Sequence, residues 1–278
     1  MSVSENPEIG ETLQAGKVAT NIHDNHFESD KTPVMFLHGS GPGVSAWANW
    51  RLNLPAIGQT RRAIAPDILG FGYTQRPQDN RYTMAGWLEH LNDICSVLEL
   101  EQVDLIGNSF GGALALAFSV AYPERVRRLV LMGSAGIDFP LTEGLDAVWG
   151  YEPSEANMLT LMDTFAFNKE LVNEELAALR YRASIVPGVQ EAYASMFPAP
   201  RQEAIRAIAT KEADIRGIKA KTLIVHGRDD QVIPLQNSYR LHELIDDSQL
   251  HVFGRCGHWT QIEYAETFNQ LLQTFFDS

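Results

Sequence analysis

Short apolar segments alternate with longer segments of helical periodicity along most of this chain. The apolar segments end in glycine or in polar turn residues, as the strands of a buried sheet do. We therefore predict strands at residues 34–37, 62–65, 103–106, 129–132, 223–225 and 250–253, and helices at residues 84–98, 112–121, 236–244 and 264–276. This alternation predicts an α/β fold with a mostly parallel sheet flanked by helices.

The alternation stops after the fourth predicted strand, and residues 145–210 have helical periodicity only. Ser154 is expected to cap one helix of this segment, and Asn168 another that runs to Ser184. An insertion here would cover the carboxyl ends of the strands, where α/β sheets bind ligands. We therefore expect a lid, with a helical hairpin of no function as the alternative. The expected division is a first core part at residues 1–144, the helical lid at 145–210 and a second core part at 211–278.

Composition and charge narrow the class of protein. The chain has 278 residues, 45% of them hydrophobic, so it is long enough to bury a core without disulfides. Its formal net charge is −13, and no cluster of lysine or arginine is longer than the pair Arg127 and Arg128. Nucleic acid and anionic membranes are therefore not expected as partners.

The cellular compartment is also indicated by the sequence. Cys95 and Cys256 are the only cysteines, which is too few for a disulfide framework. The amino terminus lacks the basic and apolar regions of a signal peptide, and no apolar run reaches the roughly 20 residues needed to cross a bilayer. These features predict a cytoplasmic location.

The strongest chemical motif is Gly107-Asn108-Ser109-Phe110-Gly111, which has the pattern G-x-S-x-G. It follows a predicted strand and precedes a helix of small residues, which is the context of a nucleophile elbow. Such an elbow holds serine in a strained conformation, and a Cβ on either flanking residue would collide with a neighbouring element. A chance match is the alternative, but the context favours Ser109 as the nucleophile.

A serine nucleophile needs a base, and the base needs a carboxylate that fixes its tautomer. In chains with this elbow, the carboxylate and then the histidine follow the serine. His258 is the expected base because, of all the histidines, it alone lies in a glycine-bounded loop beyond the last predicted strand. Asp229 and Asp230 both follow the preceding strand. Asp230 is preferred because it lies three residues after Gly227 and four before Pro234.

Hydrolysis through a tetrahedral intermediate also needs two backbone N–H groups directed at the developing oxyanion. One is expected from Phe110, directly after the nucleophile. The second is expected from the glycine-rich loop at residues 38–43, with Ser40 as the preferred donor and Gly41 as the alternative. A phosphate-binding loop is excluded here, because G-x-G-x-x-G is absent and no lysine follows.

With these motifs together, the chain resembles the α/β-hydrolase superfamily over nearly its whole length. Within that superfamily it resembles the meta-cleavage product hydrolases of aromatic catabolism, and especially the 2-hydroxymuconate-semialdehyde hydrolases. The resemblance rests on HGSGPGVSAWANWR at residues 38–51, GNSFGG at 107–112, LMGSAG at 131–136, EGLDAVWGY at 143–151, LRYRAS at 179–184, MFPAPRQ at 196–202, HGRDDQVIPL at 226–235 and HVFGRCGHWTQIE at 251–263.

The resemblance implies an α/β-hydrolase fold and hydrolysis of a carbon–carbon bond in a 2-hydroxy-6-oxo-2,4-dienoate. The dienol must first be ketonised, because a carbanion leaves only when its charge is delocalised. The implied products are 2-hydroxypenta-2,4-dienoate and a small carboxylic acid. No metal and no cofactor is expected, and the implied partner is a small anionic dienoate.

The resemblance also implies which residues bind the substrate. These are Arg180 from the lid, Asn49, Asn108 and Trp259 beside the base. Arg180 is chemically sensible because a guanidinium binds a carboxylate through two hydrogen bonds, although Arg182 is a rival. Related proteins are commonly dimers, so a homodimer is expected.

Two other functions remain open from the residues alone. The first is a carboxylesterase of the same fold, and the second is a ligand-sensing protein without catalysis. Aromatic residues could form an apolar pocket for the 6-substituent, although such residues are more often part of a core. The aromatic residues considered for this pocket are Phe110, Trp149, Phe165 and Phe197.

Overall fold

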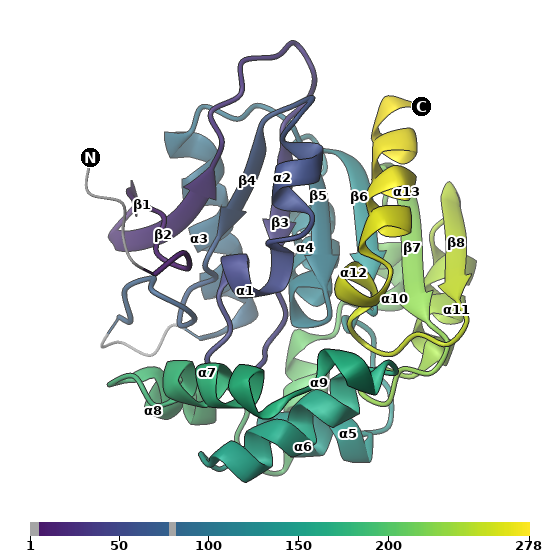
Figure 1. The fold of residues 1–278 in the computed structure, drawn as a ribbon. Helices are drawn as coiled ribbons and strands as arrows, with labels where there is room; N and C mark the ends of the chain where they lie inside the picture. The colour runs from purple at the N-terminus through teal and green to yellow at the C-terminus, as the bar shows by residue number, and fades with distance from the viewer. Residues whose placement is uncertain (1–5, 78–81) are drawn as a thin grey trace.

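The computed structural model describes residues 6–77 and 82–278, and within them one eight-stranded sheet forms the centre of the molecule (Figure 1). The strand order is β1-β2-β4-β3-β5-β6-β7-β8. Strands β3 to β8 pair in parallel, while β1 and β2 form a hairpin that pairs antiparallel with β4. The predicted α/β fold with a mostly parallel sheet is confirmed.

Every predicted strand is present, with bounds that differ by up to three residues. The hairpin of β1 and β2 was not predicted, because its strands are polar on the exposed side and lie outside the strand–helix alternation. The strands are β1 Glu11–Ala15, β2 Val18–Asp24, β3 Val34–Leu37, β4 Ala63–Pro66, β5 Val103–Asn108, β6 Val126–Met132, β7 Lys221–Gly227 and β8 Ser248–Phe253.

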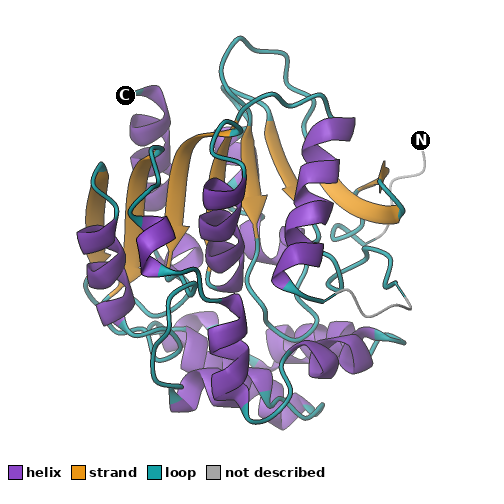
Figure 2. Ribbon diagram, turned by 180° about the vertical axis from the view of Figure 1, so that it is seen from behind, coloured by secondary structure: helices purple, strands orange, loops and turns teal. Residues whose placement is uncertain are grey.

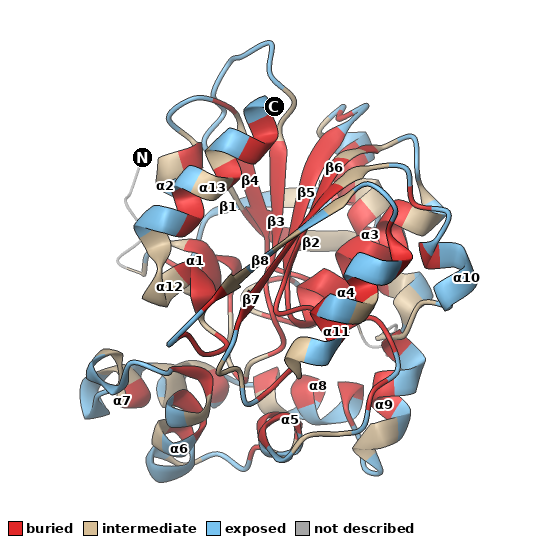
Figure 3. Ribbon diagram, turned by 90° about the vertical axis from the view of Figure 1, so that its right-hand side faces the viewer, coloured by how far each residue is buried: buried red, intermediate tan, exposed pale blue. Residues whose placement is uncertain are grey.

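Successive residues of the central strands supply two separate cores, one on each face of the sheet. On β3, Val34 and Phe36 belong to one core, while Met35 and Leu37 belong to the other. This period of two is the geometry of a strand that is buried on both sides. The apolar runs in the sequence are therefore continuous because both faces are covered (Figure 3).

Helices cover both faces of the sheet (Figures 1 and 2). One face carries α1 Ala46–Trp50, α2 Leu54–Ile57, α12 Thr260–Glu263 and α13 Ala265–Asp277. The other face carries α3 Met84–Val97, α4 Phe110–Ala121, α10 Glu212–Ile215 and α11 Leu235–Leu244. One helix prediction needs correction, because α4 begins two residues earlier than expected. The last predicted helix, at residues 264–276, agrees with α13 to within one residue, while the short helix α12 before it was not predicted.

The segment between β6 and β7 is helical, as expected, and it lies beyond the carboxyl ends of the parallel strands (Figure 1). We call α5 to α9 the helical insertion. Its elements are α5 Glu143–Trp149, α6 Glu155–Phe165, the 3₁₀ helix η1 Lys169–Leu171, α7 Glu174–Ser184, α8 Val189–Met196 and α9 Arg201–Ile208. In the part of the chain that the structure describes, no helix is long and apolar enough to cross a membrane.

Two residues of the helical insertion were predicted to cap helices, and the prediction is confirmed for Ser154 but wrong for Asn168. The Ser154 side chain accepts a hydrogen bond from the backbone N–H of Asn157 and begins α6. Asn168, however, caps only η1, and Asn173 begins α7 with a hydrogen bond from the N–H of Leu176. The prediction was wrong because the chain bends between the two asparagines, and each of them satisfies a separate helical start.

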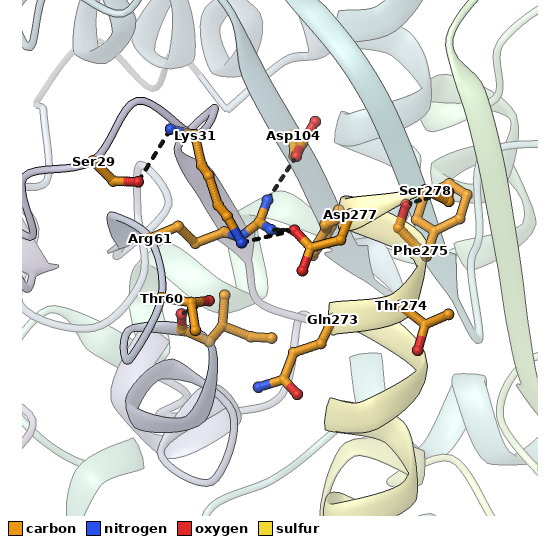
Figure 4. A network of polar contacts seen from close by, with 12 residues as sticks. Ser29, Lys31, Thr60, Arg61, Asp104, Gln273, Thr274, Phe275, Asp277 and Ser278 are labelled. Atoms are coloured by element: carbon orange, nitrogen blue, oxygen red, sulfur yellow. Dashed lines mark hydrogen bonds and ion pairs between the residues drawn. The ribbon is translucent and has the colours of Figure 1, made fainter.

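At the amino ends of the strands, an ion network that is buried at Arg61 and Asp104 ties the last helix to the sheet (Figure 4). Arg61, only 1% exposed, lies 3.5 Å from the carboxylate of Asp104 on β5 and also pairs with Asp277 at the end of α13. Lys31 adds a second contact to Asp277 at 3.0 Å. The network lies at the opposite end of β5 from Ser109, so it stabilises the fold without entering the site.

Candidate active site

The loop between β5 and α4 has the geometry of a nucleophile elbow. Ser109 has φ 56° and ψ −115°, a conformation that L-residues rarely adopt. A Cβ on Gly107 would lie 2.2 Å from the carbonyl oxygen of Gly111, and a Cβ on Gly111 would lie 2.3 Å from that of Leu37. The tight packing explains both glycines, and it presents the serine at the carboxyl end of β5.

His258 and Asp230 meet from loops that follow neighbouring strands. Nδ1 of His258 lies 2.7 Å from Oδ2 of Asp230, whereas Asp229 is partly exposed beside Arg228. The structure therefore pairs the histidine with the preferred aspartate and not with its neighbour. Since Asp230 accepts a hydrogen bond from Nδ1–H, the proton stays on Nδ1, and Nε2 on the other edge of the ring is left to act as an acceptor.

Asp230 is held as a carboxylate by its surroundings. Burial by itself raises its pKa, but attraction from His258 and hydrogen bonds from His226 and His258 outweigh burial and hold the pKa well below the usual range. Its Oδ1 also accepts the backbone N–H groups of Val232 at 2.7 Å and Ile233 at 3.0 Å. Asp230 is therefore ionised, oriented and able to fix the tautomer of His258.

A cavity of about 300 Å³ lies between the strand ends and the helical insertion. Both Ser109 and His258 line it, although no hydrogen bond joins these two described residues. Such bonds are often loose in free enzymes and shorten when substrate binds. The insertion supplies mainly apolar wall residues, which include Leu145, Met162 and Phe165.

The two expected oxyanion donors lie in different surroundings. Phe110 is the first residue of α4, so its backbone N–H has no partner within the helix, and its buried ring packs against Trp87 and Phe197 outside the cavity. Ser40 lines the cavity, and its hydroxyl accepts a hydrogen bond of 2.9 Å from the indole N–H of Trp149. The bond fixes the Ser40 side chain against the helical insertion.

Asn49, Asn108 and Trp259, for which the resemblance implies contacts with substrate, all line the cavity. Nδ2 of Asn49 is buried and has no hydrogen-bond partner among the described residues, which leaves a donor available to a ligand. Nδ2 of Asn108 donates to the carbonyl of Met132 at 3.3 Å. Trp259 stacks against Phe165 with ring centroids 5.3 Å apart. Of the aromatic residues considered for an apolar pocket, only Phe165 lines the cavity.

Arg180 also lines the cavity, and it is already paired. Its guanidinium contacts the carboxylate of Glu8, whose other oxygen accepts a hydrogen bond of 2.6 Å from the hydroxyl of Ser45. Glu8 is 7% exposed and itself lines the cavity. The sequence analysis predicted Arg180 as a site residue but not Glu8. Glu8 lies before the first strand and belongs to no sequence motif that would indicate a cavity residue.

Two further polar residues, Arg51 and Gln261, line the cavity but were not predicted as site residues from the sequence. Arg51 lies within the motif at residues 38–51, and Gln261 lies within the motif at residues 251–263. Oε1 of Gln261 is buried without a hydrogen-bond partner among the described residues. Trp50, the residue before Arg51, is fully buried in the core. The end of the short helix α1 therefore directs these two adjacent side chains to different sides, one into the core and one into the cavity.

Glu263 joins the loop of the histidine to the helical insertion. Its Oε1 accepts from the N–H of Gly257 at 2.8 Å, and its Oε2 accepts from the N–H groups of Phe167 at 3.0 Å and Asn168 at 2.8 Å. In addition, the N–H of His258 donates to the carbonyl of Phe165 at 2.7 Å. One carboxylate therefore holds the base loop and the end of α6 together.

Known proteins share this architecture over the whole chain. A family model described as alpha/beta hydrolase fold matches residues 32–265. The chain is 58% identical over 270 residues to a 2-hydroxy-6-oxo-2,4-heptadienoate hydrolase of Pseudomonas putida F1, covering 97% of each chain. It is 57% identical over 269 residues to a 2-hydroxymuconate semialdehyde hydrolase of Pseudomonas sp. strain CF600, covering 97% of this chain and 94% of that one.

The fold of this chain is also similar to that of a solved structure of the same kind of enzyme. It is a meta-cleavage product hydrolase from Pseudomonas fluorescens IP01, a serine-to-alanine mutant complexed with acetates. The two folds superpose with a TM-score of 0.95 and 54% identity, over 98% of this chain and 99% of the other. The chain is therefore an enzyme of the α/β-hydrolase class. Within that class it belongs to the meta-cleavage product hydrolases, which hydrolyse carbon–carbon bonds.

Proposed function

We propose that the substrate is the ring-fission product of a catechol, of the 2-hydroxymuconate semialdehyde or 2-hydroxy-6-oxohepta-2,4-dienoate type. The relatives that are 57% and 58% identical are named for these two compounds. The observation that carries the proposal is a single cavity with Ser109 and the Asp230-paired His258 in its wall, Arg180 also lining it, and largely apolar surroundings. This arrangement suits a small anion with an apolar 6-substituent.

In the proposed reaction a proton is first moved from the 2-hydroxyl group to the carbon chain, so that the dienol becomes a ketone. The hydroxyl oxygen of Ser109, or of a water molecule, then attacks the C6 carbonyl and gives its proton to His258. The resulting tetrahedral oxyanion is stabilised by the backbone N–H groups of Phe110 and Ser40. The C5–C6 bond breaks, and its electron pair is delocalised as the dienol forms again. One water is consumed, and its atoms are shared between the carboxylic acid and 2-hydroxypenta-2,4-dienoate.

The side chains have distinct roles in this proposal. Ser109 and His258 carry out nucleophilic and acid–base steps, and Asp230 orients His258. Arg180, Asn49, Asn108 and Trp259 bind the carboxylate and enol oxygens, and the helical insertion acts as a lid. A small group at C6 fits a cavity of about 300 Å³.

The test is loss of the yellow dienolate colour when the pure protein is mixed with the substrate without added metal or nucleotide. We expect bleaching by the wild type and a loss of at least about a thousandfold in kcat with Ser109→Ala. Full turnover by Ser109→Ala would overturn the assigned nucleophile. A fluorophosphonate that fails to label Ser109 would favour a ligand-sensing protein.

A carboxylesterase is separated from this proposal by Arg180→Ala. This change should impair turnover of the dienoate far more than turnover of a neutral ester, because only the dienoate carries the carboxylate. The cytoplasmic location and the homodimer stay predictions, which cell fractionation and light scattering after size-exclusion chromatography will check.

A further inference from the structure

The charges of the cavity do not balance. Among the residues that the structure describes, the ionisable side chains that line it, apart from His258, are Glu8, Arg51 and Arg180. Two arginines and one glutamate leave one positive charge. This local excess stands in a chain whose formal net charge is −13. The cavity is therefore electrostatically suited to a monoanion, while the rest of the protein repels one.

The excess charge belongs to Arg51. Both carboxylate oxygens of Glu8 are occupied, one by Arg180 and the other by the hydroxyl of Ser45. Arg51 makes no ion pair among the described residues, and its Nη1 donates to the carbonyl of Ala48 at 2.6 Å. That single bond anchors the guanidinium beside α1 and leaves its remaining N–H groups for another acceptor.

Arg51 and Arg180 are also close enough to repel each other. Burial lowers the pKa of Arg51, repulsion from Arg180 lowers it further, and attraction from Glu8 opposes both effects. Two guanidinium groups in one partly buried place are unfavourable unless anions lie near them. Glu8 provides one such anion, so a second anion would complete the neutral set.

We propose that Arg51 is a further substrate-binding residue, whose guanidinium joins that of Arg180 around the carboxylate of the substrate. The identity of that carboxylate as a dienoate rests on the proposed function. Glu8 keeps Arg180 in position, and Ser45 keeps Glu8 in position. The three charged side chains and one monocarboxylate together have no net charge, so the site selects a monoanion over a neutral ligand.

The test compares substrates that differ in charge. Arg51→Gln, Arg51→Lys and the wild type are assayed with the dienoate, with the anionic mono-4-nitrophenyl glutarate and with neutral 4-nitrophenyl butyrate. We expect Arg51→Gln to raise KM for both anions roughly tenfold or more, because a hydrogen bond to a charged group is lost, and to leave the neutral ester unchanged. Arg51→Lys should retain part of the preference.

A matched control removes an arginine elsewhere. Arg206 on α9 has a side chain 54% exposed and does not line the cavity, so Arg206→Gln should leave KM unchanged for all three substrates. If Arg51→Gln raised KM equally for the anionic and the neutral ester, Arg51 would have a merely structural role and the inference would be overturned. Unchanged KM values for the two anions would overturn it as well.

The same assays separate this inference from the proposed function. If the wild type leaves the dienoate yellow but prefers the anionic ester, and Arg51→Gln removes that preference, the proposed substrate is wrong and the role of Arg51 stands. If the dienoate is bleached equally well by the wild type and Arg51→Gln, the proposed function stands and the role of Arg51 is wrong.

Discussion

The guanidinium of Arg180 on α7 is ion-paired with the carboxylate of Glu8, a residue 172 positions earlier in the chain. The side chains are 15% and 9% exposed, so the pair is largely removed from water. It connects the helical insertion to the segment before β1. The position of the arginine in the cavity therefore depends on a part of the chain that is remote from the catalytic motifs.

Glu8→Ala should loosen α7. The change leaves the guanidinium of Arg180 and the hydroxyl of Ser45 without their acceptor, which costs about 1–3 kcal/mol for a buried polar group. We expect faster amide hydrogen exchange in α7 and a lower kcat/KM for the dienoate. Glu175→Ala, at an exposed position on the same helix, is the control. Unaltered exchange in α7 after Glu8→Ala would contradict a holding role for the pair.

Glu263→Ala should lower kcat by about tenfold or more. The variant removes the acceptor for three backbone N–H groups, those of Gly257, Phe167 and Asn168, and so loosens the loop that carries His258. Since no contact with substrate is lost, KM should change less than kcat. Steady-state kinetics on folded protein will check this, with Glu266→Ala as an exposed control. If Glu263→Ala lowered the melting temperature but left kcat unchanged, the role of Glu263 would be structural only.

Asp67 should make stability depend on pH. Burial raises the pKa of its carboxyl to about 7, although the three hydrogen bonds that it accepts oppose the shift. The unfolded value is about 3.9. Between these values the folded protein keeps a proton that the unfolded chain has released, so the free energy of unfolding falls as pH rises from about 4 to 7.

The measurement for Asp67 is denaturant unfolding at several pH values. The fall expected from this one group is roughly 3–4 kcal/mol, complete above about pH 7. Asp67→Asn cannot release a proton, so the difference in stability between the variant and the wild type should shift in favour of the variant as pH rises. A difference that is constant over this range would disprove the assignment.

Asp104→Ala should be among the most destabilising changes outside the site. It leaves the buried guanidinium of Arg61 without the charge of its fully buried partner (Figure 4). It also removes the partner of Arg127. Breaking a buried ion pair from one side typically costs about 3–5 kcal/mol.

Chemical denaturation will measure this loss for Asp104→Ala. Asp163→Ala removes an exposed partner of Lys169 and should cost at most about 1 kcal/mol. Because Asp104 lies at the amino end of β5, kcat of the folded variant should be unchanged. If Asp104→Ala and Asp163→Ala lowered the free energy of unfolding by the same small amount, the ion pairs of Asp104 would contribute little to stability.

The positions of the candidate triad could be predicted because their signals are local. Ser109 lies in a five-residue pattern between a buried strand and a helix, and His258 and Asp230 follow strands whose apolar runs are visible in the sequence. Parallel strands bring such loops to one edge of a sheet, so their order along the chain was enough to place them together. Spacing to Gly227 and Pro234 favoured Asp230 over Asp229, and His258 lies 2.7 Å from Asp230 in the structure.

The sequence by itself determined the α/β architecture, the helical character of the insertion and the order of the catalytic loops, because these follow from local periodicity and turn residues. Only the tertiary structure decided that Glu8 holds Arg180, that Glu263 joins the base loop to the insertion and that Arg51 remains as an unmatched charge in the cavity. Those contacts join residues far apart in the chain. No periodic pattern records them, because each depends on the positions of long side chains after the sheet and the insertion have packed together.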